Sequence, residues 1–479
     1  MAKKAKTVFV CQECGYESSK WMGQCICGAR NSMVEEKIPV IDENDRRRRT
    51  SGAGASGAFV TGTRPGFAGE GAGRAGHPSK LAEIRSGETT RIDTGIGELN
   101  RVLGGGLVPG SLTLISGEPG IGKSTIIIQA AAHIARQTGT VLYVSGEESE
   151  DQIKMRADRV CGDLSDRLYI LAETNMENIS AVCQNLQPAF LIIDSIQTMY
   201  TAELESAPGS VSQVRACGNE LMRIGKTGGI PVFIVAHVTK SGDLAGPRIV
   251  EHMVDCVLSF TGDRSHEMRI LRAQKNRFGT TSEIGAFEMA QEGLIEIENL
   301  SGMLMEEMDR DNDGAVATAV YEGTRPLILE VQALTSPCNV GFPRRTSVGV
   351  ENNRLNMILA VLEKKMGLKL GALDVYVNIV GGLRPEGTYT DLAVAMAIMS
   401  SCLGRPLDSR TLVLGEIGLT GDLRSVQNAE KIVREAERLG FSQVVLPIRN
   451  AERLRKSSGV PKDIRIVGIR NITEVRALF

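Results

Sequence analysis

The sequence predicts an α/β protein whose central domain is built on a mostly parallel β-sheet. Between residues 91 and 300, apolar runs of strand length alternate with helical stretches. Continuous apolar runs are typical of strands buried on both faces, and parallel strands need crossover helices between them. Four cysteines within the first 27 residues, and a second strand–helix region after residue 300, predict a further module at each end.

Local apolar patterns place the individual elements. In the central domain the expected strands are 112–116, 141–144, 190–193, 232–235 and 256–260, and a helix follows the first of them from residue 126. In the C-terminal region we expect strands at 375–380 and 442–446 and helices at 351–365, 389–402 and 427–439. Between the N-terminal cysteines and the central domain, residues 36–90 are rich in Gly, Ala, Ser and Arg, which predicts a flexible linker.

The composition limits the function classes. The chain has 479 residues, too many for one ordinary domain, and a formal net charge of −2. A nucleic-acid surface would therefore be a local patch or a channel formed by assembly. No apolar run reaches membrane-spanning length, and the apolar stretch after the basic N-terminus is too short for a signal peptide. We therefore expect a cytoplasmic protein whose ten cysteines are thiols or metal ligands.

A phosphate-binding loop is the most informative motif. The pattern G-x-x-x-x-G-K-[ST] follows an apolar strand and precedes a helix, which is the context that the motif requires. Its backbone N–H groups can surround a phosphate, its lysine can reach the terminal phosphates and its serine can bind Mg²⁺. The loop consists of Gly117, Glu118, Pro119, Gly120, Ile121, Gly122, Lys123, Ser124 and Thr125.

Hydrolysis of a nucleoside triphosphate also needs an acid for the metal and a base for the attacking water. Asp194 ends an apolar strand and is the expected magnesium-associated acid, together with Ser124. Glu147 and Glu148 follow the strand that lies between loop and acid in the sequence. Either can be the base, and we prefer Glu147 because it comes first after the strand; the other can stabilise the N-terminus of the next helix.

His237 ends the fourth apolar strand. A polar group there can sense the γ-phosphate, but a lone histidine can equally be a satisfied structural residue. The two interpretations stay open on the sequence.

This order of strands, each followed or ended by a polar residue, resembles the RecA-type ATPase core. Residues 94–107 resemble the lead-in segment of that superfamily. The pentapeptide Lys275-Asn276-Arg277-Phe278-Gly279, together with the cysteines and the C-terminal region, resembles the RadA (Sms) family of bacterial DNA-repair proteins over nearly the whole chain. The resemblance implies ATP and Mg²⁺ as cofactors, a homo-oligomeric ring (a hexamer), single-stranded and branched DNA, and the recombinase RecA as partner. It also implies branch migration of recombination intermediates.

In RecA-like rings ATP lies between subunits, which implies a role for the pentapeptide at the site of a neighbour. Lys275 and Arg277 are then a trans-acting cation pair, and Asn276, Phe278 and Gly279 complete the nucleotide pocket. Two loops, at about 201–215 and 239–251, are expected to face the DNA channel.

The N-terminal cysteines predict a zinc module at residues 1–35. Cys11 and Cys14 form a Cys-x-x-Cys pair, whereas Cys25 and Cys27 are one residue closer than the resemblance implies. Four thiolates with glycine turns are typical of a tetrahedral Zn²⁺ site. A weakened site or a redox-active pair is the alternative.

The region 351–479 resembles the proteolytic domain of Lon-type proteases, which use a Ser–Lys dyad. Counting along the motifs at 391–397 and 415–421, the serine position holds Asp391 and the lysine position holds Glu430, so we expect no peptidase activity. We expect a scaffold and DNA-binding platform joined to the central domain by residues 301–350. Its candidate phosphate contacts are Lys364, Lys365, Lys369, Arg384, Arg424 and Lys431.

The predicted function is that of a DNA-dependent ATPase that moves along DNA, associated with the nucleoid when it acts. A KaiC-like regulatory ATPase and an ATP-dependent protease are the alternatives.

Overall fold

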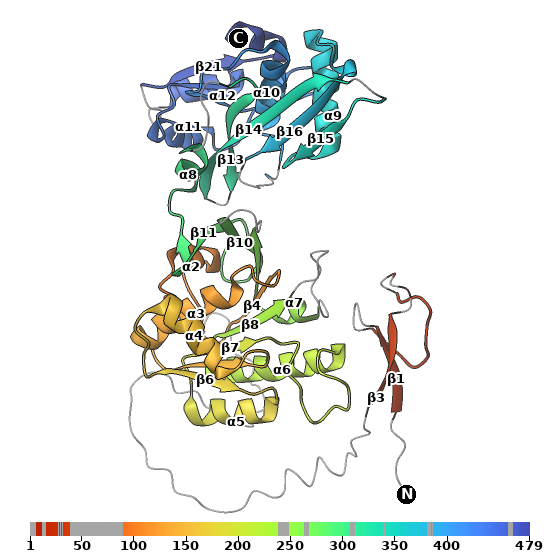
Figure 1. Ribbon diagram of the computed structural model, residues 1–479, viewed down its shortest axis with the longest axis vertical. Helices are drawn as coiled ribbons and strands as arrows, with labels where there is room; N and C mark the ends of the chain where they lie inside the picture. The colour runs from red at the N-terminus through yellow and green to blue at the C-terminus, as the bar shows by residue number, and fades with distance from the viewer. Residues whose placement is uncertain are drawn as a thin grey trace, which may run out of the picture. The chain divides into compact units, whose positions relative to one another are not determined.

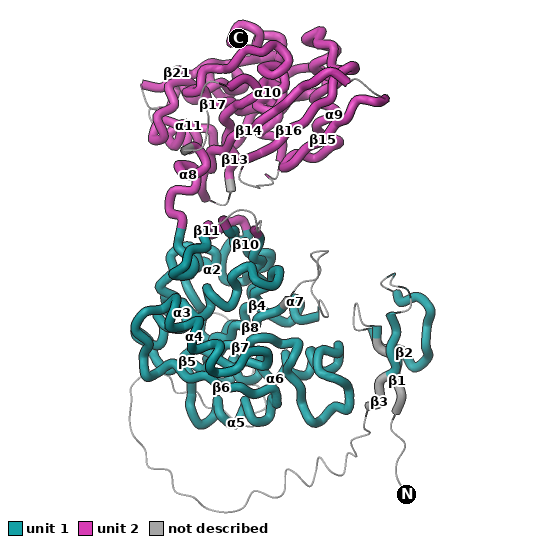
Figure 2. The backbone as a smooth tube through the Cα atoms, in the orientation of Figure 1, with its two compact units in different colours: residues 1–261, 269–281, 287–296 teal, residues 262–268, 282–286, 297–479 magenta. Residues whose placement is uncertain are grey.

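The computed structural model describes residues 6–11, 16–26, 28, 30, 32–38, 90–237, 249–262, 268–306, 312–322, 324–338, 341–380, 385, 387–457 and 463–479. The chain divides into two compact units (Figure 2). One unit comprises residues 1–261, 269–281 and 287–296, and the other comprises 262–268, 282–286 and 297–479.

A small antiparallel sheet forms the N-terminal module. It has the strand order β2-β1-β3, from β1 (Lys6–Cys11), β2 (Glu17–Ser18) and β3 (Met33–Ile38). Cys11 and Cys25 are buried beside Met33, so two of the four predicted zinc ligands share one small core. Cys14 and Cys27 lie outside the described residues.

The central domain contains a nine-stranded sheet in the order β12-β11-β10-β9-β4-β8-β7-β5-β6 (Figure 1). The segment from β9 to β6 is parallel throughout, which confirms the predicted mostly parallel sheet. Its strands are β4 (Leu112–Gly117), β5 (Val141–Ser145), β6 (Leu168–Ala172), β7 (Phe190–Asp194), β8 (Val232–His237), β9 (Cys256–Gly262), β10 (Met268–Asn276), β11 (Ile284–Ala290) and β12 (Gly293–Glu296).

Alternate residues of these strands feed two separate cores, because successive side chains point to opposite faces. One core joins Ile115, Tyr143 and Ile192 to helices on one face, and the other joins Leu114 and Val144 to helices on the opposite face. The first face is covered by α2 (Gly97–Leu103), α3 (Lys123–Gln137) and α4 (Glu150–Cys161), and the second by α5 (Met176–Leu186), α6 (Val211–Gly228) and α7 (Ile249–Met253).

The first predicted channel loop is shorter than expected, because α6 begins at Val211 and not after residue 215. Ser210 caps this helix by accepting a hydrogen bond from the Gln213 backbone N–H. The buried Gln213 side chain also donates to the carbonyls of Thr201, Leu204 and Ser206, which folds the loop onto the start of the helix. Most of the second predicted loop lies outside the described residues.

The C-terminal unit is a second α/β domain with a seven-stranded sheet in the order β15-β16-β14-β13-β17-β20-β21. Its strands are β13 (Ala315–Glu322), β14 (Arg325–Pro337), β15 (Arg345–Val348), β16 (Leu373–Ile379), β17 (Thr411–Val413), β20 (Gln443–Pro447) and β21 (Arg465–Ile469), with β18 (Glu416–Ile417) and β19 (Leu423–Arg424) as a separate pair. Its α-helices are α8 (Leu300–Glu306), α9 (Asn352–Val361), α10 (Asp391–Leu403), α11 (Ala429–Arg438) and α12 (Ile448–Lys456). One π-helical turn (Leu362–Met366) and 3₁₀ turns (Leu370–Ala372 and Ile472–Leu478) complete the unit.

Within the described part of the chain, every helix is too short or too polar to span a membrane.

Candidate ATPase site and associated motifs

The phosphate loop connects β4 to α3, as the motif predicts. Gly117 ends the strand, and a Cβ atom there would lie 2.7 Å from the Phe260 carbonyl oxygen. Gly122 has a φ of 117°, in the region that favours glycine, and it directly precedes the first helical residue, Lys123. The first N–H groups of a helix have no intrahelical acceptor, so the start of α3 can bind an anion.

Lys123 is buried within its own loop. Its Nζ donates hydrogen bonds to the carbonyl oxygens of Gly117, at 2.7 Å, and Glu118, at 3.0 Å. Burial lowers the pKa of Lys123 to about 8, while the nearby carboxylates of Asp194 and Glu147 act in the opposite direction. The ammonium group therefore lies near both acids that the sequence singles out.

Asp194 joins the phosphate loop to the neighbouring strands. Its Oδ2 accepts a hydrogen bond from Ser124 Oγ at 2.9 Å and another from the buried Tyr143 hydroxyl at 2.5 Å. A hydroxyl and a carboxylate oxygen are ligands that suit Mg²⁺. The two predicted magnesium ligands are thus adjacent, and this donor set fits the metal.

Glu147 and Glu148 have different partners. Ser195 Oγ donates a hydrogen bond to Glu147 Oε1, whereas Arg156 of α4 forms an ion pair with Glu148 Oε1. The Glu148 backbone N–H is also fixed, because it donates to Ser145 Oγ at 2.9 Å. The Arg156 pair engages the second carboxylate, and the first remains within electrostatic reach of Lys123.

The strand between β4 and β7 is β8. The strand that precedes the tandem glutamates, β5, lies on the far side of β7. His237 ends β8 and pairs directly with Gly117 in the parallel register. Its backbone therefore lies next to the first residue of the phosphate loop. Its side chain is outside the described set.

The pentapeptide at 275–279 begins with the last two residues of β10 and packs against the lead-in segment. Asn276 Nδ2 donates to the Val102 carbonyl at 3.1 Å, and the Phe278 carbonyl accepts a 2.7 Å bond from the Arg91 guanidinium. A Cβ atom at Gly279 would lie 3.0 Å from the Cα of Gly104, so the two backbones are in close contact. A side chain at either Gly104 or Gly279 would disturb this contact.

The two cations of the pentapeptide also have partners within the subunit. Lys275 Nζ donates to the carbonyl oxygens of Glu251, at 2.8 Å, and His252, at 3.3 Å. Desolvation and the neighbouring Arg277 lower the pKa of Lys275. The Arg277 side chain is 60% exposed and contacts Asp255 Oδ1 at 3.3 Å.

Arg277 lies beside the amino end of β4, whereas the phosphate loop follows the carboxyl end of that strand. The Arg277 N–H donates to the Asp255 carbonyl, and the Asp255 N–H donates to the carbonyl of Leu112, the first residue of β4. Gly117 is at the other end of that strand, roughly 16 Å away at about 3.3 Å per residue. The structure therefore brings together Lys123, Ser124, Glu147 and Asp194, and it holds the pentapeptide apart from them within one chain.

Metal-ligand clusters of three or more His, Cys, Asp or Glu residues are absent from the described residues. Other cysteines in the described part of the central domain are thiols in apolar surroundings, as expected. Burial raises their pKa values to about 11 for Cys161 and Cys183 and to about 12 for Cys217 and Cys256.

In the C-terminal unit, Asp391 occupies the predicted serine position and is buried at the start of α10. Both of its carboxylate oxygens accept hydrogen bonds from the Arg354 guanidinium, and Oδ2 also accepts the Ile417 N–H at 3.0 Å. Burial raises the pKa of Asp391 despite these bonds. Glu430, at the predicted lysine position, pairs instead with Arg434 and accepts a hydrogen bond from Ser457.

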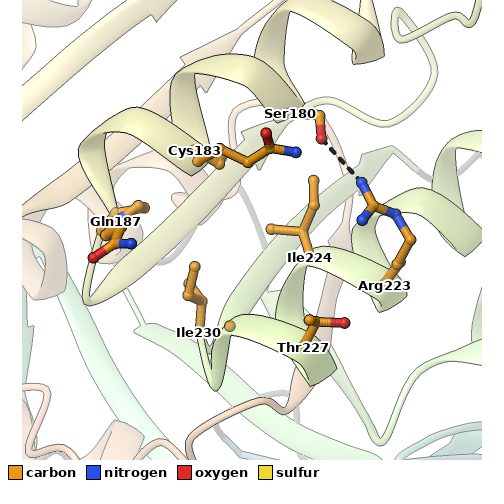
Figure 3. Close-up of a pocket in the computed structure, with 10 residues that line it drawn as sticks. Ser180, Cys183, Gln187, Arg223, Ile224, Thr227 and Ile230 are labelled. Carbon is orange, nitrogen blue, oxygen red and sulfur yellow. Dashed lines mark hydrogen bonds between the residues drawn. The ribbon is translucent and has the colours of Figure 1, made fainter. Parts of the chain in front are cut away.

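A separate pocket of about 600 Å³ lies between α5 and α6 (Figure 3). Ser180 and Cys183 line one side and Arg223, Ile224 and Thr227 the other, with a 3.2 Å hydrogen bond from Arg223 to Ser180 Oγ. The sequence did not predict this pocket.

Sequence reasoning also missed three residues that support the site: Tyr143, Arg156 and Ser195. Each is polar and lies in or directly next to an apolar strand or helix face, where a buried hydroxyl or guanidinium needs a partner. That rule could have marked Tyr143, which is fully buried in the middle of β5. It could not have named Asp194 as the acceptor, because that contact joins separate strands.

The fold and this loop define a P-loop ATPase with a RecA-like, mostly parallel core. The comparisons agree with this class. The model of the AAA domain matches residues 78–243, that of the rubredoxin metal binding domain matches 9–35, and that of subunit ChlI of Mg-chelatase matches 337–450.

Full-length relatives define the family. DNA repair protein RadA of Bacillus subtilis (strain 168) is 47% identical over 472 residues, covering 98% of each chain. DNA repair protein RadA of Streptococcus pyogenes serotype M6 is 46% identical over 481 residues, covering 100% of each chain. The chain therefore belongs to the RadA family of DNA-repair proteins.

Among solved structures, the KaiC-like protein PH0186 from Pyrococcus horikoshii OT3 is 18% identical, with a TM-score of 0.37. The match covers 44% of this chain and 99% of that chain.

Proposed function

We propose that this protein is a DNA-stimulated ATPase that assembles into a ring on single-stranded DNA and promotes branch migration of recombination intermediates in the cytoplasm. Its membership in a DNA-repair family and its ATP site support this proposal. The main observation in its favour is that Arg277 lies at the end of β4 opposite to the phosphate loop of its own subunit. RecA and branched DNA are the expected partners, and a hexamer is the expected oligomer.

Each residue of the ATP site has a distinct role in this proposal. Lys123 and the N–H groups at the start of α3 bind the β- and γ-phosphates, and Ser124 and Asp194 hold Mg²⁺, which neutralises phosphate charge. Glu147 orients the attacking water and accepts its proton. His237, next to Gly117, is the candidate sensor of the γ-phosphate.

Glu147 is the better candidate for the base because it lies close to the phosphate loop. It is within electrostatic reach of Lys123, and its Oε1 accepts a hydrogen bond from Ser195. Glu148 forms an ion pair with Arg156 of α4, which gives that carboxylate a structural role.

Arg277 acts on the γ-phosphate of a neighbouring subunit, assisted by Lys275. Arg277 is held beside the start of β4, and roughly 16 Å of strand separates that point from the phosphate loop at the other end of β4, so Arg277 is remote from the loop of its own subunit. Its 60% exposure leaves it accessible to another subunit. A guanidinium supplied in trans stabilises the charge of the transition state, and Asn276, Phe278 and Gly279 complete that surface.

The N-terminal module holds Zn²⁺ through Cys11, Cys14, Cys25 and Cys27. Two of these thiols share a small core in the described structure, and the match to a rubredoxin metal binding domain supports a four-thiolate site.

The C-terminal domain is a scaffold and DNA platform without peptidase activity. The Asp391 carboxylate is acceptor-only when ionised, and Glu430 cannot replace a lysine base. Lys364, Lys365 and Lys369 are exposed and are the best placed of the candidate phosphate contacts. Arg424 pairs with Glu416, Lys431 contacts Tyr321, and Arg384 lies outside the described residues.

ATP hydrolysis measured with single-stranded DNA, with duplex DNA and without DNA tests the proposal. We expect single-stranded DNA to stimulate the wild-type protein and Lys123→Ala to be inactive under all three conditions. An ATPase rate that does not respond to DNA would favour a KaiC-like regulatory protein, and peptide release from casein would favour a protease. A joint-molecule assay with RecA then tests branch migration.

Mixing inactive variants tests the shared site. Lys123→Ala and Arg277→Ala are each expected to be inactive, but their mixture should recover hydrolysis, because Arg277 of the first variant can serve the intact phosphate loop of the second. The matched control mixes Arg277→Ala with the Lys123→Ala/Arg277→Ala double variant, in which no subunit has Arg277. Equal rates in the two mixtures would contradict action in trans.

A further inference from the structure

Asp255 connects Arg277 to β4, the strand that leads into the phosphate loop. It is 5% exposed and directly precedes β9. Its Oδ2 accepts the backbone N–H of Leu112, the first residue of β4, at 3.1 Å. Its Oδ1 accepts a hydrogen bond from Arg277 at 3.3 Å.

The main chain of Asp255 makes the same two connections. Its N–H donates to the Leu112 carbonyl at 2.9 Å, and its carbonyl accepts the Arg277 N–H at 3.1 Å. Four hydrogen bonds thus place one buried residue between the start of β4 and the pentapeptide. A contact that uses both backbone and side chain restricts orientation as well as position.

We propose that Asp255 is a positioning residue for Arg277. This proposal rests on the proposed trans action of Arg277. It adds a second residue, in the subunit that supplies the cation, on which that action depends. The Asp255 carboxylate holds the Arg277 guanidinium in the orientation that it needs to reach the nucleotide of the neighbouring subunit. Because the same carboxylate is fixed to Leu112, the cation is held in register with the phosphate-loop strand of its own subunit.

The charges around Asp255 offer a control for this role. Lys226 of α6 also contacts Asp255, at 2.9 Å, but through Oδ2 and not through the Oδ1 that contacts Arg277. Substituting Lys226 removes one charge from Asp255 and leaves the bonds to Leu112 and Arg277 in place. If weakened packing or a changed local charge caused the loss of hydrolysis, variants of Asp255 and of Lys226 would both lose activity. If Asp255 positions Arg277, only the Asp255 variant would lose activity.

The first experiment compares DNA-stimulated kcat and the affinity for a non-hydrolysable ATP analogue in Asp255→Asn, Lys226→Met and Arg277→Ala. We expect Asp255→Asn to lower kcat by roughly tenfold to a hundredfold, since misplacement by about 1 Å has an effect of that order. Analogue affinity should be unchanged, and Lys226→Met should keep kcat. Full kcat in Asp255→Asn, or an equal loss in Lys226→Met, would overturn the proposal.

The second experiment isolates the subunit that supplies the cation. Wild-type protein is mixed with excess Lys123→Ala or with excess Lys123→Ala/Asp255→Asn, so that only wild-type subunits hydrolyse ATP. The second mixture should be slower, because Asp255 is altered only in the neighbour; equal rates would assign Asp255 a role within its own subunit and reject the proposal. If the asparagine variant does not fold, Asp255→Glu, which moves the carboxylate by one methylene, replaces it with the same expectation.

The two proposals fail separately. Full activity of Arg277→Ala would reject trans action itself. An inactive Arg277→Ala that is recovered by Lys123→Ala, together with full activity of Asp255→Asn, would reject only the positioning role.

Discussion

Ser124 Oγ donates a hydrogen bond to Asp194 Oδ2 at 2.9 Å, which joins the first turn of α3 to the end of β7. The strand β8 lies between β7 and β4, the strand that leads into α3. The contact therefore depends on the register of these parallel strands. The same carboxylate oxygen accepts the Tyr143 hydroxyl. The two proposed magnesium ligands are therefore held next to each other by the fold itself.

Lys123 should make nucleotide affinity depend on pH. Its pKa is about 8 without nucleotide, and bound phosphates raise it by favouring the charged form. Below about pH 8 the lysine is protonated in both states and affinity is constant. Above it, binding must take up a proton, so affinity should fall by up to about tenfold per pH unit.

Calorimetric titration of a non-hydrolysable ATP analogue between about pH 7 and pH 9.5 measures this dependence. Lys123→Met should bind more weakly and show no such fall. Constant wild-type affinity over that range would show that Lys123 does not titrate there.

The two tandem glutamates should differ in their effect on turnover. Glu147→Gln removes the proposed base and should lower kcat by about 10²–10⁴-fold with analogue binding retained. Glu148→Gln weakens the Arg156 ion pair and should cause a much smaller loss. Steady-state ATPase assays of the two variants, with binding measured in parallel, decide between them, and the reverse order would assign the base to Glu148.

Asp391 should be a structural residue of the C-terminal domain. Asp391→Ala leaves the Arg354 guanidinium and the Ile417 N–H without their partner, and breaking a buried ion pair costs about 3 kcal/mol or more. Hydrogen exchange around residues 415–421 should therefore accelerate by about two orders of magnitude. Glu430→Ala, which removes a surface pair with Arg434, is the control and should leave exchange in this segment unchanged.

The N-terminal module should contain zinc. Elemental analysis of the purified chain should find one zinc ion per chain, and Cys11→Ser and Cys25→Ser should each reduce that content, because both thiols lie in the small core. Cys183→Ser, a buried thiol between α5 and α6, is the control and should retain the metal. Iron in place of zinc would contradict the proposed metal.

Local patterns were sufficient to predict five strands of the central domain, β4, β5, β7, β8 and β9, to within a few residues. The apolar run at 112–116 is β4, and the runs at 141–144 and 190–193 are β5 and β7. Strands β6 and β10 to β12 were not predicted; in β10 the polar residues Arg269 and Arg272 interrupt the apolar run. The loop predicted at about 201–215 also extends too far, because the Ser210 cap and the loop contacts of Gln213 start α6 at Val211.

The sequence by itself indicated the candidate residues whose proposed role follows from their place on one element: the phosphate loop, the acid at the end of β7 and the paired cations at the end of β10. The order of strands decided the long-range contacts. It placed Tyr143 against Asp194, and it set Asp255 between Leu112 and Arg277. The physical reason is that hydrophobic periodicity specifies which face of an element is buried, whereas hydrogen-bond partners distant in sequence are fixed only when strand order and register are fixed.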